Sequence, residues 1–243
     1  MVFTIQNADV KQGRVENALV IGVSHCAVFG AEDESGAAFT LLQAVQLVNE
    51  RLLQLKTSDS SSVQMEVVLI CTNIQQQQKD QIQTKTRESG LQIHRFSFYE
   101  DNLTDCLLEN KVDLFLTTDS EEAKQAASKG VLCTLLDPLS AHGPSEQLRV
   151  MFCADAILDL NTGSHQAFWS HLGDIRQRLG VEDSPLALVL LSSHGGINAC
   201  CSALRSLRTL GLSVDEAYCL GGSPRKPIMS LLRPHFLLGA PKE

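Results

Sequence analysis

Short apolar runs alternate along the chain with stretches in which apolar residues recur every three or four positions. The runs predict buried β-strands and the stretches predict amphipathic helices, because each spacing keeps apolar side chains on one face. Strands are expected at residues 17–23, 65–71, 92–97, 113–117, 131–135, 148–152, 186–191, 216–220 and 235–238, and the clearest helices at 166–179 and 196–210. This alternation predicts an α/β fold with a mainly parallel, doubly wound sheet.

The best internal boundary is the loop at residues 138–145, which contains two prolines and a glycine. We expect one α/β domain over residues 1–243, made of half-units 15–137 and 146–243. Residues 113–136 and 215–238 share one order of strand, turn, helix and strand. This order favours related half-units, although any two strand-helix-strand pieces look alike at this level.

Length and charge narrow the classes of function. With 243 residues, 44% of them hydrophobic, the chain can bury a substantial core. Its formal net charge of -8 lacks the basic surplus that would neutralise a nucleic-acid backbone, so nucleic acid is not an expected partner. No apolar run approaches the roughly 20 residues of a membrane helix, and the first residues lack the pattern of a secretory signal. We therefore expect a cytoplasmic protein without membrane association.

The eight cysteines are expected to be buried, reduced thiols. Most of them stand singly in apolar, strand-like contexts, and only Cys200 and Cys201 are adjacent. The sequence has no CxxC pair and no cluster of cysteine and histidine at zinc spacing. A disulfide framework or a zinc site is therefore not expected.

Residues that directly follow the strands are the first candidates for chemistry, because ligands bind at the carboxyl ends of parallel strands. Ser192 and Ser193 lead into a helix, where a hydroxyl and exposed amides suit a phosphate, although taken alone an ordinary serine helix cap explains them better. Arg225 and Lys226 follow a later strand, where they can neutralise a phosphate or form a solvated basic turn. Small or polar residues also follow three other strands: Ser24 with His25, Thr72 with Asn73, and residues 153–155.

Taken together, these strand ends have the sequential order of haloacid-dehalogenase-like phosphatases. One strand ends at a carboxylate, a later strand ends in a hydroxyl, and a third is followed by a cation. The chain more closely resembles the type I cytosolic 5'-nucleotidases, which remove phosphate from AMP and similar monophosphates. The resemblance covers most of the chain and is carried by residues 22–29, 147–152, 203–212, 214–217 and 233–235, with Gly222, Pro224 and Pro227.

The resemblance implies that position 153 holds the aspartate that attacks phosphorus, and that Asp155 is the general acid and base. In this chain Cys153 stands at the nucleophile position. The resemblance also implies Mg²⁺ as cofactor, and Asp155 would be its one remaining acidic ligand. Because magnesium prefers oxygen ligands, a thiol weakens this metal site. Residues 154–160 contain no basic residue that could support a metal-independent cysteine phosphatase.

Of the other positions implied by the resemblance, some hold a residue of similar chemistry and others do not. Ser192 stands where a threonine is expected, and Arg225, followed by Lys226, stands at the lysine position. Gly239 and Ala240 stand where two metal-binding aspartates are expected. The segments that cover the site in the family are also short here, so its substrate preference does not carry over.

Three functions remain open from the sequence. The first is a 5'-nucleotidase-like protein with lost or strongly reduced catalysis that retains a nucleoside monophosphate or another phosphorylated small molecule, as a homo-oligomer or with an active relative. The second is a working magnesium-dependent 5'-nucleotidase that uses Asp155 with Asp119, Asp137 or Asp159, although capping of the helix at Ser120 explains Asp119 better. The third is a structural or interaction protein with a packed, ligand-free site. We rank them in this order.

Overall fold

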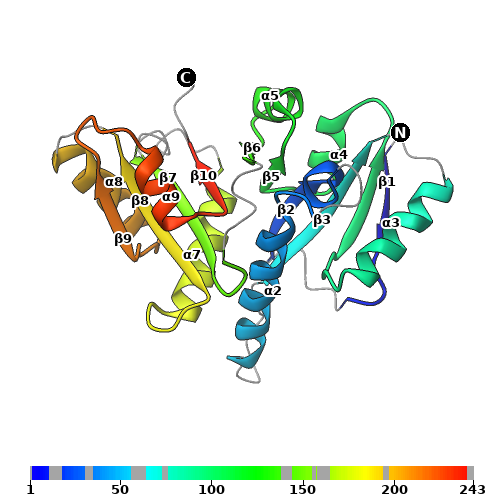
Figure 1. The fold of residues 1–243 in the computed structure, drawn as a ribbon, viewed down its shortest axis with the longest axis horizontal. Coiled ribbons are helices and arrows are strands. Elements are labelled where there is room, and N and C mark those ends of the chain that lie inside the picture. Colours follow the sequence, from blue (N-terminus) through cyan, green and yellow to red (C-terminus); the bar gives the residue numbers. More distant parts are fainter. Residues whose placement is uncertain are drawn as a thin grey trace.

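The computed structural model describes residues 2–10, 18–30, 35–55, 64–72, 76–137, 144–154, 157, 165–193 and 197–239. Its strands form two mainly parallel sheets, one of six strands and one of four (Figure 1). The expected α/β class and parallel pairing are confirmed, whereas the expected single sheet is replaced by two. Apolar periodicity identifies a strand but not its partners, which explains this difference.

The first sheet has the strand order β1-β4-β3-β2-β5-β6. All neighbouring strands are parallel except β1, which pairs with β4 in the antiparallel direction and was not expected from the sequence. Its strands are β1 (Val2–Gln6), β2 (Ala18–Ser24), β3 (Gln64–Thr72), β4 (Arg95–Tyr99), β5 (Leu114–Thr117) and β6 (Leu132–Leu135).

Helices cover both faces of the first sheet. On one face, Ile21 and Val23 pack with the buried side of α2. On the other, Val20 and Ile70 pack with Leu107 of α4 and with the buried side of α5. The helices of this half are α1 (His25–Val28), α2 (Phe39–Gln54), α3 (Gln76–Glu88), α4 (Leu103–Glu109) and α5 (Ser120–Ser128).

The second sheet is entirely parallel and has the order β10-β7-β8-β9. Its elements are β7 (Leu148–Cys153), α7 (Gln166–Leu179), β8 (Leu186–Ser192), α8 (Ile197–Thr209), β9 (Glu216–Cys219), α9 (Lys226–Leu232) and β10 (Phe236–Leu238). Residues 113–136 and 215–238, which share one order of elements, differ in how their two strands are placed in the sheet. Strands β5 and β6 are neighbours, whereas β9 and β10 lie at opposite edges.

Both sheets contribute to one hydrophobic core. The cluster around α2 includes Ile21 of the first sheet and Phe152 of the second. Trp169 of α7 packs edge to face on Phe152, with 5.3 Å between the ring centroids. At the meeting edges of the two sheets, the hydroxyl of Thr134 on β6 donates to the carbonyl of Leu237 on β10 at 2.8 Å. Figure 1 shows β6 and β10 facing each other at the centre of the molecule.

In each sheet, a histidine just before one strand makes two hydrogen bonds to the backbone of the neighbouring strand. The backbone N–H of His94 donates to the carbonyl of Val67 at 2.9 Å, and its ring Nδ1 accepts from the Val67 N–H at 3.1 Å. His235 makes the same two bonds to Arg149, at 2.9 and 3.0 Å. Burial lowers the pKa of both histidines to about 4. Both rings are therefore neutral, with Nδ1 as an acceptor.

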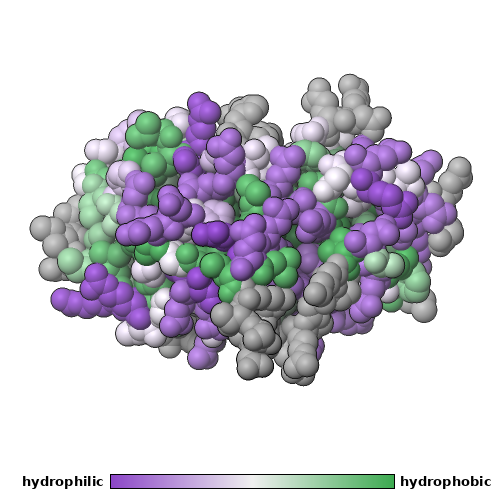
Figure 2. Space-filling model, turned by 90° about the horizontal axis from the view of Figure 1, so that it is seen from below, coloured by the Kyte–Doolittle hydropathy of each residue, from purple (hydrophilic) through white to green (hydrophobic). Residues whose placement is uncertain are grey.

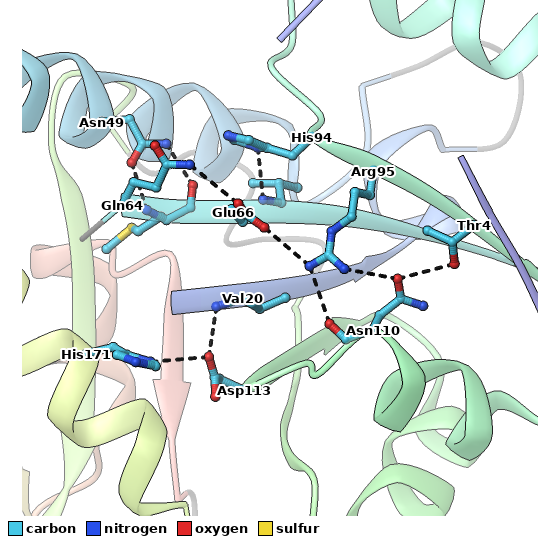
Figure 3. A network of polar contacts seen from close by, with 12 residues as sticks. Thr4, Val20, Asn49, Gln64, Glu66, His94, Arg95, Asn110, Asp113 and His171 are labelled. Carbon is cyan, nitrogen blue, oxygen red and sulfur yellow. Dashed lines mark hydrogen bonds and ion pairs between the residues drawn. The ribbon is translucent and has the colours of Figure 1, made fainter. Parts of the chain in front are cut away.

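An aspartate makes a similar double contact in each sheet. Asp113 donates its N–H to the carbonyl of Val20 and accepts the Val20 N–H on Oδ2, both at 2.9 Å (Figure 3). Asp215 holds Leu188 in the same way, at 2.8 and 2.7 Å. The ring of His171 on α7 also lies 3.6 Å from Asp113, so this contact joins the two halves.

None of the helices in the described part of the chain is long and apolar enough to cross a membrane.

Candidate functional site

The predicted site falls at the carboxyl ends of the second sheet. Cys153 is the last residue of β7, and Ser192 is the last residue of β8. Strand pairing places Cys153 opposite Leu191 and Ser192 opposite Cys219. Both side chains are about 1% exposed. The fold therefore brings these two predicted residues to one edge of the sheet, on neighbouring strands.

Strand alternation sends the two side chains toward opposite faces of the sheet. Cys153 shares the face of Met151 and Leu191, which packs with α9. Ser192 shares the face of Leu190, which packs in the large core with α8. The two residues are close along the edge, but the pleat does not aim them at one point.

The loops that follow β8 and β9 are joined by backbone hydrogen bonds. The N–H of Leu220 donates to the carbonyl of Ser192 at 2.8 Å, and that of Gly222 donates to the carbonyl of Ser193 at 3.1 Å. Gly221 and Gly222 both have positive φ, 60° and 86°, which is the pattern of a type I′ turn and favours glycine. The structure thus brings Ser192 and Ser193 against the turn that leads to the predicted cations.

The two cations differ in their surroundings. Arg225 is half-buried and directly precedes α9, and its carbonyl accepts the N–H of Met229 at 3.0 Å. Lys226 is the exposed first residue of α9. Each has the charge needed to attract a phosphate, with Arg225 nearer to the protein interior.

The acidic residues of the predicted site fall largely outside the described residues. This applies to Asp155, to Asp159 and to position 240. Gly239 follows β10 and offers no side-chain donor, while Asp137 is exposed. Within the described ranges, no group of three or more histidine, cysteine, aspartate or glutamate side chains could hold a metal ion. A buried thiol and a glycine do not fit magnesium, which prefers oxygen ligands.

A second polar cluster lies in the first sheet between β2 and β5. The strand order reverses at this point, because β3 and β4 lie on one side of β2, and β5 and β6 lie on the other. The hydroxyl of Thr117 donates to Glu122 Oε2 at 2.5 Å and lies 3.3 Å from the hydroxyl of Ser24. It also accepts the N–H of Asp119 at 3.0 Å. The Asp119 carboxylate accepts backbone N–H groups of α5, which confirms its expected role as a helix cap.

Burial controls the protonation of this second cluster. It raises the pKa of Glu122, and the hydrogen bond from Thr117 opposes that rise. Burial also raises the pKa of Cys26, aided by the charges of Glu122 and Asp119. A thiol with a raised pKa is a poor nucleophile at neutral pH. The cluster therefore secures the ends of β2 and β5 without the features of a catalytic site.

All eight cysteines are free, as expected. Their expected burial is wrong for Cys26, Cys201 and Cys219, which are exposed. Cys26 lies two residues after the end of β2 and Cys219 is the last residue of β9, where the chain leaves the core, so apolar neighbours in sequence do not bury them. The proximity of Cys219 to Cys200 was also missed, because residues on different elements give no spacing signal.

A cavity of about 330 Å³ lies elsewhere, between the end of β1 and α3. Its lining includes Gln6, Asn7, Arg87 and Gln92. An exposed ion pair between Arg87 and Asp9 borders it, with 2.9 Å between Nη2 and Oδ2. None of the site residues predicted from the sequence belongs to this lining.

Comparison with known proteins identifies a matching family and curated relatives. The family model described as 5'-nucleotidase matches residues 31–161, just over half of the chain. Human cytosolic 5'-nucleotidase 1B is 23% identical over 289 residues, which cover 91% of this chain and 45% of that protein. The chain thus spans less than half the length of this relative. No solved structure gives a significant match.

Proposed function

The chain belongs to the 5'-nucleotidase family, and on this premise we propose that it binds a nucleoside 5'-monophosphate or a similar phosphorylated molecule with little or no hydrolysis. The bound group would lie at the carboxyl edge of the second sheet. A role in nucleotide metabolism in the cytoplasm, alone or in an oligomer, belongs to the same proposal. The human relative is named as a cytosolic nucleotidase, but the likeness covers less than half of it.

The observation that carries this proposal is the buried thiol at the end of β7. Phosphoryl transfer in this family, as the resemblance implies, begins with attack by a carboxylate at that position. Cys153 is 1% exposed, and its side chain leaves the sheet on the α9 face. A thiol is neither the oxygen nucleophile nor the hard ligand that magnesium-dependent transfer requires. We therefore propose no reaction step through magnesium.

The retained groups support binding. The strand order β10-β7-β8-β9 places the Cys153 strand between the strand that ends at Ser192 and the strand that precedes Gly239. This arrangement agrees with a haloacid-dehalogenase-like plan, which we propose for this half of the chain. The turn formed by Ser193 and Gly222 and the cation of Arg225 are suited to hold a phosphate, and the Ser192 hydroxyl, which is as buried as Cys153, lies at the same edge.

The alternative is an active magnesium-dependent 5'-nucleotidase that uses Asp155. A direct assay separates the two functions: phosphate release from AMP and IMP with magnesium, for the natural chain and for Asp155→Asn and Cys153→Asp. We expect no release that is sensitive to Asp155→Asn. We also expect no recovery in Cys153→Asp, because Gly239 still lacks a carboxylate. Robust, magnesium-dependent release that Asp155→Asn abolishes would show that the enzyme is active.

A binding measurement separates the proposal from a ligand-free structural protein. With AMP at about 100 times its Kd, we expect the Tm to rise by roughly 5 °C or more. Ser192→Ala should weaken binding by roughly tenfold through loss of one hydrogen bond to a charged group. Ser230→Ala, on the exposed side of α9, is the matched control and should bind normally. No shift with AMP, IMP or inorganic phosphate would favour the structural protein.

A further inference from the structure

Two thiols from different elements meet at the carboxyl edge of the second sheet. Cys200 belongs to α8 and is 7% exposed, on the same buried face as Ala203 and Leu207. Cys219 is the exposed last residue of β9. The adjacent Cys201 is also exposed. One thiol of the pair is therefore covered by the protein, and the other is open to solvent.

Strand pairing directs the two thiols toward each other. Ser192 pairs with Cys219, and Leu190 pairs with Ala217, so these side chains share the sheet face that α8 covers. Tyr218 lies on the opposite face, with Leu191. The thiol of Cys219 lies near enough to that of Cys200 for side-chain hydrogen bonding to help raise the pKa of Cys200. The contact thus follows from the register of β9 and from the buried face of α8.

The environments of the two thiols divide the chemical roles between them. Burial, followed by the hydrogen bond and charge of Cys219 and the charge of Cys201, raises the pKa of Cys200 to about 11. Cys200 is therefore protonated at neutral pH and shielded from solvent. Of this pair, the exposed Cys219 is the thiol that a dissolved oxidant can reach first, because access limits the rate of oxidation.

We propose that Cys200 and Cys219 form an oxidative modification site, in which hydrogen peroxide converts the two thiols to a disulfide. The Cys219 thiolate attacks one peroxide oxygen and breaks the O–O bond, which gives a sulfenic acid and one water. The sulfur of Cys200 then attacks the sulfenic sulfur, loses its proton and releases a second water. Two thiols are oxidised by two electrons, and one peroxide is reduced to two waters.

The second step is favoured by position. Cys200 lies beside Cys219, so its reaction is intramolecular and does not depend on an encounter in solution. Within the described residues, these thiols belong to no group of three or more side chains suited to a metal ion.

The disulfide would tie α8 to the end of β9 beside Ser192. Any effect of this disulfide on phosphate binding rests on the proposed function, whereas formation of the disulfide does not. Each can therefore be disproved without the other. A disulfide without nucleotide binding would leave the modification site intact.

Peptide mapping tests the modification site directly. The full chain is treated with one equivalent of hydrogen peroxide, its remaining thiols are alkylated, and it is digested with trypsin without reduction. We expect loss of two of the eight thiols and a new cross-link between the peptides 179–205 and 209–225. Cys201→Ser, the matched control on the next residue, should form the same cross-link, which identifies Cys200 as the partner.

Two variants complete the test. Cys219→Ser removes only an exposed thiol, and in this variant we expect Cys200 and Cys201 to stay reduced. Cys200→Ser should trap Cys219 as a sulfenic acid that dimedone labels. If the two-thiol loss persists in Cys219→Ser, or if Cys219 oxidises in the natural chain without a cross-link, the proposal is wrong. Circular dichroism before oxidation verifies that each variant is folded.

Discussion

The two sheets differ in how thoroughly their faces are covered. The first sheet is enclosed by α2 on one side and by α4 and α5 on the other, each of which contributes buried residues. The second is covered by α7 and α8 on one side, whereas on the other side the described residues provide only α9, none of whose residues is buried. Figure 2 shows hydrophobic surface at the left end of the molecule, on the side of the second sheet. The sheet that carries the proposed site is thus the less protected one.

Polar contacts reflect the same difference. In the first sheet, Arg95 contacts Glu66 at 3.3 Å and the side chain of Asn110 at 3.4 Å (Figure 3). The Glu66 side chain is 1% exposed. In the second, the fully buried Arg176 contacts Asp215, whose side chain is 21% exposed. Removal of either arginine leaves a carboxylate behind, and only in the second sheet can water reach it.

The largest expected effect is therefore on the first sheet. Arg95→Ala should lower the free energy of unfolding by about 3–5 kcal/mol, because Glu66 would be left charged and buried. Arg176→Ala should cost less, about 2–3 kcal/mol, because Asp215 can be hydrated. Urea unfolding followed by circular dichroism gives both values. A larger loss for Arg176→Ala would reverse the comparison.

Exposed arginines provide the controls for this pair. Arg87→Ala and Arg178→Ala should each change the free energy of unfolding by no more than about 0.5 kcal/mol. The fluorescence of Trp169, the one tryptophan of the chain, reports on the second sheet. Because the two sheets share a core, its transition should coincide with that seen by circular dichroism.

An effect of intermediate size should follow from pH. The pKa of His94 and of His235 is about 4 in the folded protein and about 6.5 in an unfolded chain. Below pH 6.5 the unfolded chain binds protons that the folded protein does not, so stability falls as pH is lowered from 6.5 to 4. Each histidine should cost about 2 kcal/mol at pH 5 relative to pH 7. Urea unfolding at the two pH values measures this loss.

Asparagine is the informative replacement, because it keeps an acceptor but does not titrate. Asn49 already accepts the N–H of Met65 at 2.9 Å in this protein. His94→Asn and His235→Asn should each reduce the pH-dependent loss by about 2 kcal/mol. Equal reductions would show that the two sheets use equivalent contacts. An unchanged pH dependence in either variant would show that its histidine does not titrate as proposed.

The smallest effect is expected on the thinly covered face. Leu231 of α9 is 72% exposed, so Leu231→Ser should change the free energy of unfolding by at most about 0.5 kcal/mol. Leu107→Ala, at a fully buried position of α4, should cost about 2–5 kcal/mol. Thermal unfolding of both variants gives the contrast. A cost above about 1 kcal/mol for Leu231→Ser would indicate that α9 is covered in solution.

The sequence predicted elements more successfully than it predicted their arrangement. Residues 166–179 form a helix with the expected bounds, because its apolar positions follow the helical period without interruption. The strand expected at 92–97 begins only at Arg95, since His94 is used for the double contact with Val67. The short edge strand β1 was missed because its side chains are mostly half-buried or exposed.

The candidate site shows the same limit. The sequence could predict that Ser192 lies at the same sheet edge as the end of β7, because parallel strands place their carboxyl ends at one edge. The opposite orientations of Cys153 and Ser192 could not, because they depend on the pleat and on the register between β7 and β8. The meeting of Cys200 and Cys219 depends on the packing of α8, which no local pattern encodes.

The hydrogen bond between Thr134 and Leu237 has a consequence for association between molecules. An open sheet edge is a template on which a strand of another chain can add, and proteins limit this risk by covering or shortening their edges. Two open sheets have four outer strands, and here β6 and β10 shelter each other. Strand addition would have to begin at β1 or β9, which have five and four residues. The junction between the sheets thus also protects the molecule against aggregation.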